Sequence, residues 1–127
     1  MILIFTVAAL LANLPVMAQH MHQKDSPCAN VVVTVDLESC LAKASDAADA
    51  NLNAAYRELR SKLDAANMQR LVDAQRLWIQ YRDANCSAER DLYEGHTAAS
   101  PAYLACLEAM TRARTKELTI TYAVKLK

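Results

Sequence analysis

Glycine is nearly absent from this chain of 127 residues: Gly95 is the only one, and proline occurs three times. Neither residue occurs between positions 36 and 94, so nothing in that stretch breaks a helix in the way that glycine and proline do. Paired strands are also lacking. Residues 30–35 form one short β-branched run, and no second alternating run appears before residue 118. The chain is therefore predicted to be all-α.

The chain also lacks a net charge, because 14 lysines and arginines balance 14 aspartates and glutamates. A protein without an overall positive field does not attract polyanions over a distance. On this ground we expect neither nucleic acid nor a membrane as a partner of the mature chain.

Closely spaced metal ligands are missing as well. The nearest cysteines are twelve residues apart, and zinc sites are typically built from C-x-x-C or H-x-x-x-H pairs. His20, Met21 and His22 form a short ligand-like group, but without supporting side chains a solvated tail is the better interpretation. We predict no metal and no cofactor.

A catalytic constellation is lacking too. Ser, His and Asp residues do not fall at a shared height on the predicted helices, and His96 stands alone in a predicted loop. No residue has the neighbours of a nucleophile or of a general base. The sequence therefore predicts that the protein is not an enzyme and has no catalytic residues.

Residues 1–18 have the features of a secretory signal peptide. Asn13 and Pro15 interrupt the apolar run, and the chain has no charged residue before Lys24. Small residues occupy positions −3 and −1 relative to a cleavage site ahead of Gln19. An uncleaved membrane anchor is the alternative, but the run is short and interrupted. We expect a periplasmic or secreted protein of one domain.

Three predicted segments follow the leader. Residues 19–35 comprise a polar mobile arm up to residue 27 and an extended lead-in that packs along a helix. Residues 36–127 form the helical domain. Asp36 is the expected N-cap of a helix to about residue 65, and Asn67 the expected break before a second helix, 68–93. The short connection favours an antiparallel hairpin over a kinked helix.

A third helix is predicted after Gly95, which suits the left-handed residue that follows a helix C-terminus. Ser100 is the expected N-cap and Pro101 the first helical residue. The end of the chain, residues 118–127, frays or extends. We therefore predict an antiparallel three-helix bundle with a long helical hairpin, stapled by disulfides, in which residues 71–86 form the central helix.

One face of that central helix mixes apolar and polar side chains at helical spacing. Because helices rise 1.5 Å per residue, matching heights across the hairpin places Tyr56 by Trp78 and Asp49 by Arg82, with Arg114 at the same level. Such a convergence also suits an active site. The planar guanidinium of arginine has a fixed set of hydrogen-bond donors that suits structural pairing with carboxylates, so we favour a structural network of these five residues instead.

The four cysteines, Cys28, Cys40, Cys86 and Cys106, lie in the predicted exported part, where an even number is typical of two disulfides. We prefer Cys28 with Cys40, and Cys86 with Cys106. Pairing Cys40 with Cys106 and Cys28 with Cys86 is also compatible with the predicted helices.

Several motifs together resemble one family. The sequence A-D-A-N-L-N-A-A-Y at 48–56, the run A-Q-R-L-W-I-Q-Y-R-D-A-N-C at 74–86 and T-R-A-R-T-K-E-L at 111–118 are similar to small exported bacterial proteins of the LprI lysozyme inhibitor family. The resemblance covers residues 28–118. It implies a helical, disulfide-bonded periplasmic or cell-surface domain, and it implies inhibition of lysozyme to protect peptidoglycan.

The candidate binding surface is the loop at the end of the second helix, because it is an exposed tip carried by two helices. Animal lysozymes are typically basic, so an inhibitor steered toward them is expected to be acidic, and the neutral total charge of this chain counts against inhibition. Acidic residues gather near this loop, although a solvated helix end is the simpler interpretation of them. The candidate binding residues are Glu89, Asp91, Glu94, Gly95 and His96.

The alternative function is that of a structural or protein-interaction module of the cell envelope. Such a module would use the alanine-rich face of the first helix to pack against a partner or a second copy of the chain. The sequence leaves the oligomeric state open.

Overall fold

The computed structural model describes residues 20–127, so the predicted signal peptide lies outside the described residues. Four helices follow one another: α1 (Thr34–Lys62), α2 (Ala65–Asp91), α3 (Ala99–Thr121) and the short α4 (Ala123–Leu126). No strand occurs in this part of the chain. The predicted all-α class is confirmed.

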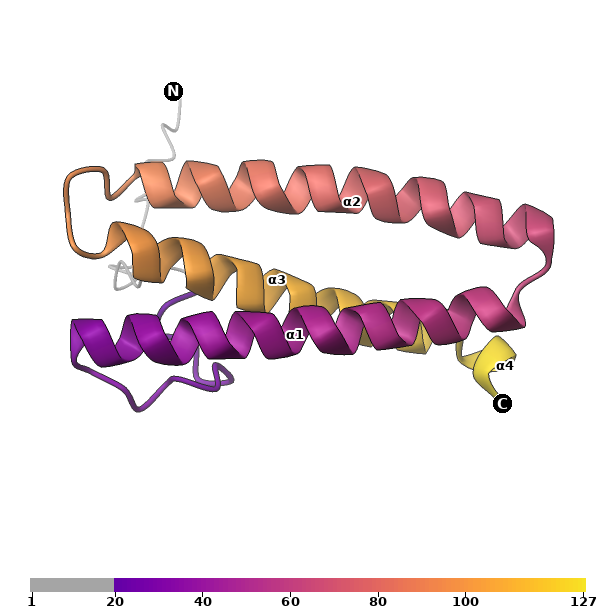
Figure 1. The fold of residues 1–127 in the computed structure, drawn as a ribbon, viewed down its shortest axis with the longest axis horizontal. Coiled ribbons are helices and arrows are strands. Elements are labelled where there is room, and N and C mark those ends of the chain that lie inside the picture. Colours follow the sequence, from indigo (N-terminus) through magenta and orange to yellow (C-terminus); the bar gives the residue numbers. More distant parts are fainter. Residues whose placement is uncertain (1–19) are drawn as a thin grey trace, which may run out of the picture.

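The three long helices form the predicted bundle with its long hairpin. α1 and α2 run antiparallel and are joined by Leu63 and Asp64, while α3 returns beside them, parallel to α1 (Figure 1). α3 packs against both α1 and α2, whereas α1 and α2 make few direct contacts with each other. The prediction that residues 71–86 form the central helix is wrong, because α3 occupies that position.

Burial along the helices agrees with this placement. The buried residues of α2 are only Leu71, Gln75 and Cys86. α3 is shorter and buries eight residues: Pro101, Ala102, Ala105, Cys106, Glu108, Ala109, Thr111 and Leu118. The many small residues of α3 let the neighbouring helices approach it from two sides, which a large residue such as Trp78 does not allow.

The helix boundaries differ from the predicted ones at each start. α1 begins before Asp36, and its N-cap is Val33, whose side chain makes no capping hydrogen bond. Asp36 lies in the first turn, where the positive end of the helix dipole stabilises its negative charge. α2 begins before Asn67 because Asp64 caps it: Asp64 Oδ1 accepts a hydrogen bond from the Asn67 N–H at 2.9 Å. Asn67 is the capped residue and not the break.

α3 begins after Ala98, two residues before the predicted N-cap. Ser100 is inside the first turn, and its hydroxyl donates to Glu38 Oε1 at 2.5 Å, so it links α3 to α1 instead of capping its own helix. Gly95 does have the predicted left-handed conformation, with φ of 77°, although α2 ends four residues before it. The glycine therefore shapes the loop and does not terminate the helix.

The segment before α1 is folded against the bundle. Residues 20–30 form successive turns, and the side chain of Met21 is 6% exposed in a cluster with Leu37 and Leu41. This differs from the solvated arm that the polar composition indicated. The lead-in packs only in part, because Val31 contacts this cluster whereas Val32 is 87% exposed.

Two disulfides link the elements, and the preferred pairing is confirmed. Cys28 binds Cys40, with 6.0 Å between the Cα atoms, and fixes the N-terminal segment to α1. Cys86 binds Cys106, with 5.4 Å between the Cα atoms, and joins α2 to α3.

The core has two parts on either side of a polar layer. One lies near the α2–α3 loop and includes Met21, Leu37, Leu41, Ala102 and Ala105. The other lies near the α1–α2 turn and includes Leu52, Leu59, Leu71 and Leu118, with Tyr56 and Trp78 packed against it. Among residues 20–127, no helix is long and apolar enough to span a bilayer.

Candidate functional site

The loop between α2 and α3 lies at the end of the bundle opposite to the α1–α2 turn, near the level at which α1 starts (Figure 1). Successive turns stiffen it: the Tyr93 N–H donates to the Arg90 carbonyl at 2.9 Å, and the His96 N–H donates to the Tyr93 carbonyl at 2.9 Å. The positive φ of Gly95 completes the reversal. The side chain of Tyr93 anchors the loop on the core below it.

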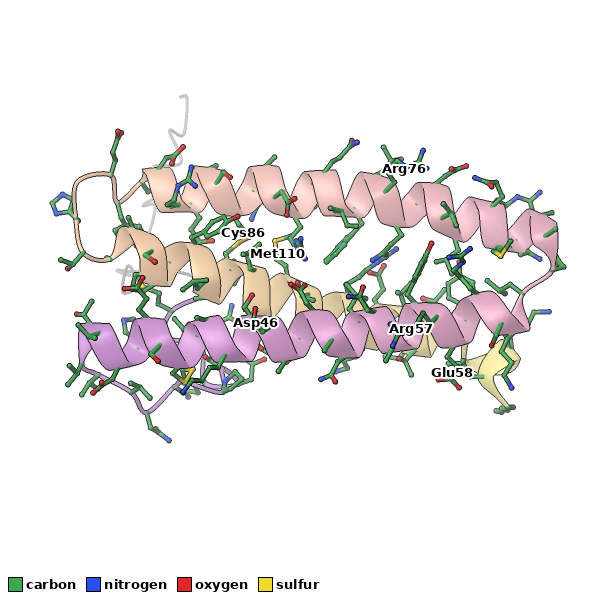
Figure 2. All side chains as sticks on the ribbon, viewed as in Figure 1. Asp46, Arg57, Glu58, Arg76, Cys86 and Met110 are labelled. Carbon is green, nitrogen blue, oxygen red and sulfur yellow. A yellow bond between two sulfur atoms is a disulfide. The ribbon has the colours of Figure 1, made fainter. Side chains whose placement is uncertain are left out.

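The disulfide Cys86–Cys106 holds the two helices that carry this loop. Figure 2 shows Cys86 and Met110 in the space between α2 and α3, and Met110 Sδ lies 3.7 Å from Cys86 Sγ. Asn85 Nδ2 is 3.5 Å from the same thioether sulfur. The base of the loop is therefore fixed by a covalent bond and by packing around sulfur.

Four of the five predicted binding residues lie together at the surface of the loop: Asp91, Glu94, Gly95 and His96 are exposed. Arg90, Asp91, Glu94, Gly95 and Ala99 line a shallow hollow of about 370 Å³. This surface offers carboxylates, an imidazole and backbone groups to a partner. It holds no arrangement that activates a nucleophile.

Glu89 does not belong to that surface. Its side chain is 12% exposed and turns inward, where Oε2 accepts a hydrogen bond from His20 Nδ1 at 2.7 Å. Its other oxygen, Oε1, is buried without a partner among the described residues. The sequence signalled neither the burial of Glu89 nor its contact with His20, because His20 lies 69 positions away in a segment expected to be solvated.

A metal site does not arise from this pair. His20, Glu89 and Cys106 bring possible ligand atoms within 4.8 Å of one another. The sulfur of Cys106 is bonded to Cys86, so it is not the thiolate that metals bind. Two ligands remain, which is fewer than a specific site needs.

Four residues of the predicted structural network, Asp49, Trp78, Arg82 and Arg114, meet around Arg82, whereas Tyr56 packs against the core near the α1–α2 turn. Arg82 Nη1 donates to Asp49 Oδ1 and to Thr111 Oγ1, both at 3.1 Å, and so joins α2 to α1 and α3. The guanidinium lies 5.3 Å from the ring centroid of Trp78, and that of Arg114 lies 5.8 Å from the same ring.

The remaining contacts of the network are also structural. Arg114 Nε donates to the buried Gln75 Oε1 at 3.1 Å. The Arg82 side chain is 15% exposed and that of Asp49 is 50% exposed, so their ion pair is partly solvated. The layer fixes the register of the three helices and presents no general acid or base.

A second buried acid escaped the sequence analysis. Glu108 is 2% exposed on α3 and accepts hydrogen bonds from Arg112, which also pairs with Asp25 at 2.8 Å. The hydrogen bond to Glu108 holds the pKa of the Arg112 guanidinium above its ordinary value. The hydrogen bond and charge of Arg112 hold the pKa of the Asp25 carboxyl below its ordinary value. The spacing of Glu108 and Arg112, four residues apart, was the available signal.

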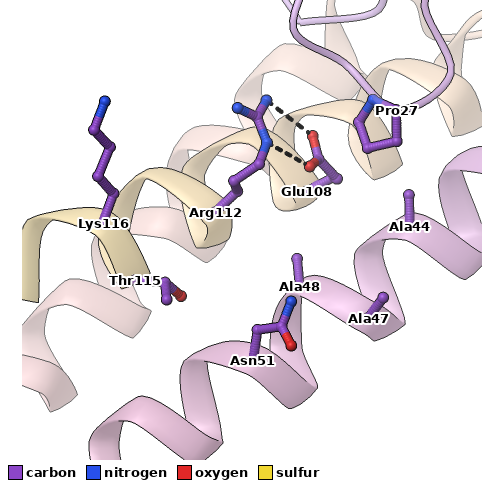
Figure 3. A pocket seen from close by; sticks show the side chains of 9 residues that line it. All are labelled: Pro27, Ala44, Ala47, Ala48, Asn51, Glu108, Arg112, Thr115 and Lys116. Carbon is purple, nitrogen blue, oxygen red and sulfur yellow. Dashed lines mark hydrogen bonds and ion pairs between the residues drawn. The ribbon is translucent and has the colours of Figure 1, made fainter. Parts of the chain in front are cut away.

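A groove of about 380 Å³ lies between α1 and α3 beside this pair (Figure 3). Its α1 wall is made of small side chains, Ala44, Ala47 and Ala48, and Arg112 and Lys116 stand on the α3 side. The alanine-rich face of α1 therefore remains partly open to a partner.

Charge is distributed unevenly along the bundle. Arg82 contacts both Asp49 and Thr111, so these three residues mark a common level in the three helices. On the loop side of that level, residues 20–48 and 83–110 carry nine acidic and three basic side chains, a net charge of −6. On the turn side, residues 50–81 and 112–127 carry ten basic and four acidic side chains, a net charge of +6. We call these the acidic half and the basic half.

Comparison with known proteins identifies relatives of this chain. The sequence model of a family described as lysozyme inhibitor LprI matches residues 26–118. An uncharacterised protein of Rhizobium meliloti (strain 1021) is 31% identical over 109 residues, covering 76% of this chain and 78% of that protein. No solved structure matches the chain.

Proposed function

The chain belongs to the LprI family of lysozyme inhibitors, and from this premise we propose that it binds lysozyme and occludes its cleft with the α2–α3 loop. The family match over residues 26–118 carries the proposal. This range runs from just before the first disulfide to the last buried residue of α3, so it includes both helices that support the loop.

The shape of the loop suits occlusion of a cleft. Lysozymes cleave a polysaccharide between two carboxyl groups, one of which must be protonated, so a blocking group has to reach into a groove lined by acids. His96 stands exposed at the tip, and its imidazole is able to donate a hydrogen bond to such a carboxylate. The disulfide and the turns hold the loop in one shape, which reduces the entropy lost on binding.

The charge of the acidic half suits a basic partner. Although the whole chain is neutral, the half that bears the loop has a net charge of −6. Complementary charge raises the rate of encounter and orients the two proteins before they touch. A basic animal lysozyme would therefore approach the loop end of the bundle.

This function needs an extracytoplasmic location and no catalysis. Two disulfides cross-link the described chain, and disulfides persist in oxidising compartments such as the periplasm and the cell exterior. The predicted leader at residues 1–18 would direct export. There the protein would shield peptidoglycan from muramidases without acting as an enzyme itself.

A lysozyme inhibition assay on the oxidised mature chain tests the proposal. We expect inhibition of a basic animal lysozyme, weakened by about tenfold in the double variant Asp91→Lys with Glu94→Lys, because two acids of the loop become basic. The matched control is Glu58→Lys with Asp73→Lys, which makes the same charge change in the basic half. Undiminished lysozyme activity in a micromolar excess of inhibitor would end the proposal.

The alternative, an envelope interaction module, is favoured by the open groove between α1 and α3. A helix from a partner or from a second copy would cover Ala44 and Ala47 there, next to the already buried Ala48. Small residues permit close helix approach. Sedimentation equilibrium separates the cases, since a strictly monomeric chain with no partner recovered from envelope extracts counts against this alternative.

A further inference from the structure

The basic half exposes an excess of unpaired cations. Among residues 20–127, eight of its ten basic side chains have no carboxylate oxygen within the 4.0 Å that defines an ion pair. They are Arg57, Arg60, Lys62, Arg70, Arg76, Lys116, Lys125 and Lys127. Figure 2 shows Arg57 and Arg76 on α1 and α2 toward the turn that joins these helices. Within the protein, little neutralises this charge.

Aliphatic side chains are exposed among these cations at the C-terminal end. Ile120 is 65% exposed and Val124 is 78% exposed, although the neighbouring Leu118 is fully buried. Lys116 precedes them on α3, and Lys125 and Lys127 lie beside Val124 at the end of the chain. Exposed cations and exposed aliphatic side chains therefore occur together along residues 116–127.

We propose that the basic half binds the surface of an anionic phospholipid bilayer, with its cations on the headgroup phosphates and with Ile120 and Val124 in the interface. A bilayer surface satisfies both kinds of side chain, because it offers negative charge next to an apolar boundary. A nucleic acid would instead call for several exposed aromatic rings to stack on bases, whereas Tyr81 is the one aromatic among the large hydrophobic side chains that the described basic half exposes, and Ile120 and Val124 are aliphatic. A soluble anionic polymer would leave those aliphatic groups in water.

The neutral total charge gave the opposite expectation because it averages the two halves. A membrane acts on the charges within about one Debye length, which is about 8 Å at physiological ionic strength, whereas α1, with 29 residues, is about 40 Å long. The surface attracts the basic half while the acidic half lies beyond its field. The bundle then stands with its α2–α3 loop directed away from the lipid.

Flotation of the mature chain with lipid vesicles tests this inference. We expect binding to phosphatidylcholine vesicles that contain phosphatidylglycerol, none to phosphatidylcholine alone, and release at high salt. The double variant Lys125→Gln with Lys127→Gln should lower the partition coefficient about 25-fold, because each surface cation contributes roughly a fivefold gain in binding. Equal binding to both kinds of vesicle, or to neither, overturns the proposal.

Matched controls separate local charge from net charge. Lys24→Gln with Lys43→Gln removes two exposed cations from the acidic half, so the total charge changes equally but binding to vesicles should not. If both double variants lose binding alike, the basic half is not the contact surface. Far-UV circular dichroism verifies that each variant keeps its helices.

A variant of the aliphatic pair distinguishes lipid from other polyanions. Val124→Ser should weaken flotation but leave retention on a heparin column unchanged. If Val124→Ser floats as well as the wild type, and heparin competes fully for the protein, the partner is a soluble polyanion and the lipid assignment fails. Inhibition of lysozyme by the Lys125→Gln and Lys127→Gln variant should be unaltered, so this test is independent of the proposed function.

Discussion

Arg82 is the residue that touches most parts of the bundle. Its guanidinium binds Asp49 on α1, Thr111 on α3 and the neighbouring Asp83, and it lies over the ring of Trp78. One side chain thus links all three long helices at one level of the bundle. Removing it leaves partners on two other helices without their donor.

Replacing Arg82 by alanine should lower the free energy of unfolding by about 1 to 2 kcal/mol. A fully buried ion pair would cost about 3 to 5 kcal/mol when broken, but Asp49 is half exposed and solvent screens the charge that remains. Urea denaturation of the oxidised mature chain measures the change. Arg76→Ala, which removes an exposed arginine earlier on the same helix, should stay within about 0.5 kcal/mol of wild type. Equal effects of the two substitutions would show that the network does not stabilise the fold.

At the scale of elements, the start of α2 depends on Asp64. The Asn67 N–H donates to Oδ1 at 2.9 Å and the Asn67 amide donates to Oδ2 at 2.7 Å. These two hydrogen bonds hold the pKa of the Asp64 carboxyl below its ordinary value, and the bond from the backbone N–H has the larger effect. Because the folded pKa is lower than the unfolded one, the carboxylate stabilises the fold above the unfolded pKa, near 4, and this stabilisation is lost as pH falls through the folded pKa.

Substitutions at Asp64 should separate the cap from its charge. Asp64→Asn keeps an acceptor for the cap, so its melting temperature at pH 7 should stay close to wild type, while its loss of stability between pH 4 and pH 2 should be smaller. Asp64→Ala should melt at a lower temperature at pH 7 because the cap itself is removed. Thermal melts followed by circular dichroism across this pH range measure both effects. A wild-type acid profile in Asp64→Asn would contradict the assignment.

Which helix lies at the centre of the bundle is also decided at the scale of elements. The only tryptophan and the regular apolar spacing drew attention to residues 71–86, yet α3 contacts both other long helices. Spacing along one helix identifies a face that avoids water, but it does not identify which helix is covered on two sides. Small residues such as Ala102, Ala105 and Ala109 mark the central helix here, since they allow close approach on either flank.

For the whole molecule, the separation of charge matters more than its sum. The acidic half and the basic half carry −6 and +6, so the bundle is a large electric dipole with no net charge. Such a molecule is oriented by the field of a charged partner even though it is not attracted on average at long range. Encounter with a basic protein is then favoured at one end.

The rate of association with a basic lysozyme should therefore depend on ionic strength. Between about 0.01 and 0.15 M salt the Debye length shrinks from about 30 Å to 8 Å, and we expect the association rate constant to fall about tenfold while dissociation changes little. Stopped-flow fluorescence measures both rates. Reversing Asp91 and Glu94 should flatten the dependence, whereas reversing Glu58 and Asp73 should not. A flat dependence for the wild type would rule out steering by the acidic half.

The sequence by itself determined the helical class and indicated the hairpin and the proximity of Asp49 to Arg82, whereas it left two disulfide pairings open and the structure decided between them. The class, the hairpin and this proximity follow from local or periodic causes: the lack of glycine and proline sets helix length, and a constant rise per residue sets which positions share a height. Helix starts were less accurate because a cap depends on the conformation of a few residues, as Asp64 illustrates.

Only the tertiary structure decided where the remaining side chains lie. Glu89 turns inward because His20 folds back onto the bundle, and no local pattern links residues so far apart in the chain. The division of charge was hidden for a similar reason. Acidic and basic stretches alternate along the sequence and cancel, and they separate into two halves only when the chain reverses direction at residues 63–64 and again at the α2–α3 loop, which brings like-charged stretches to the same end.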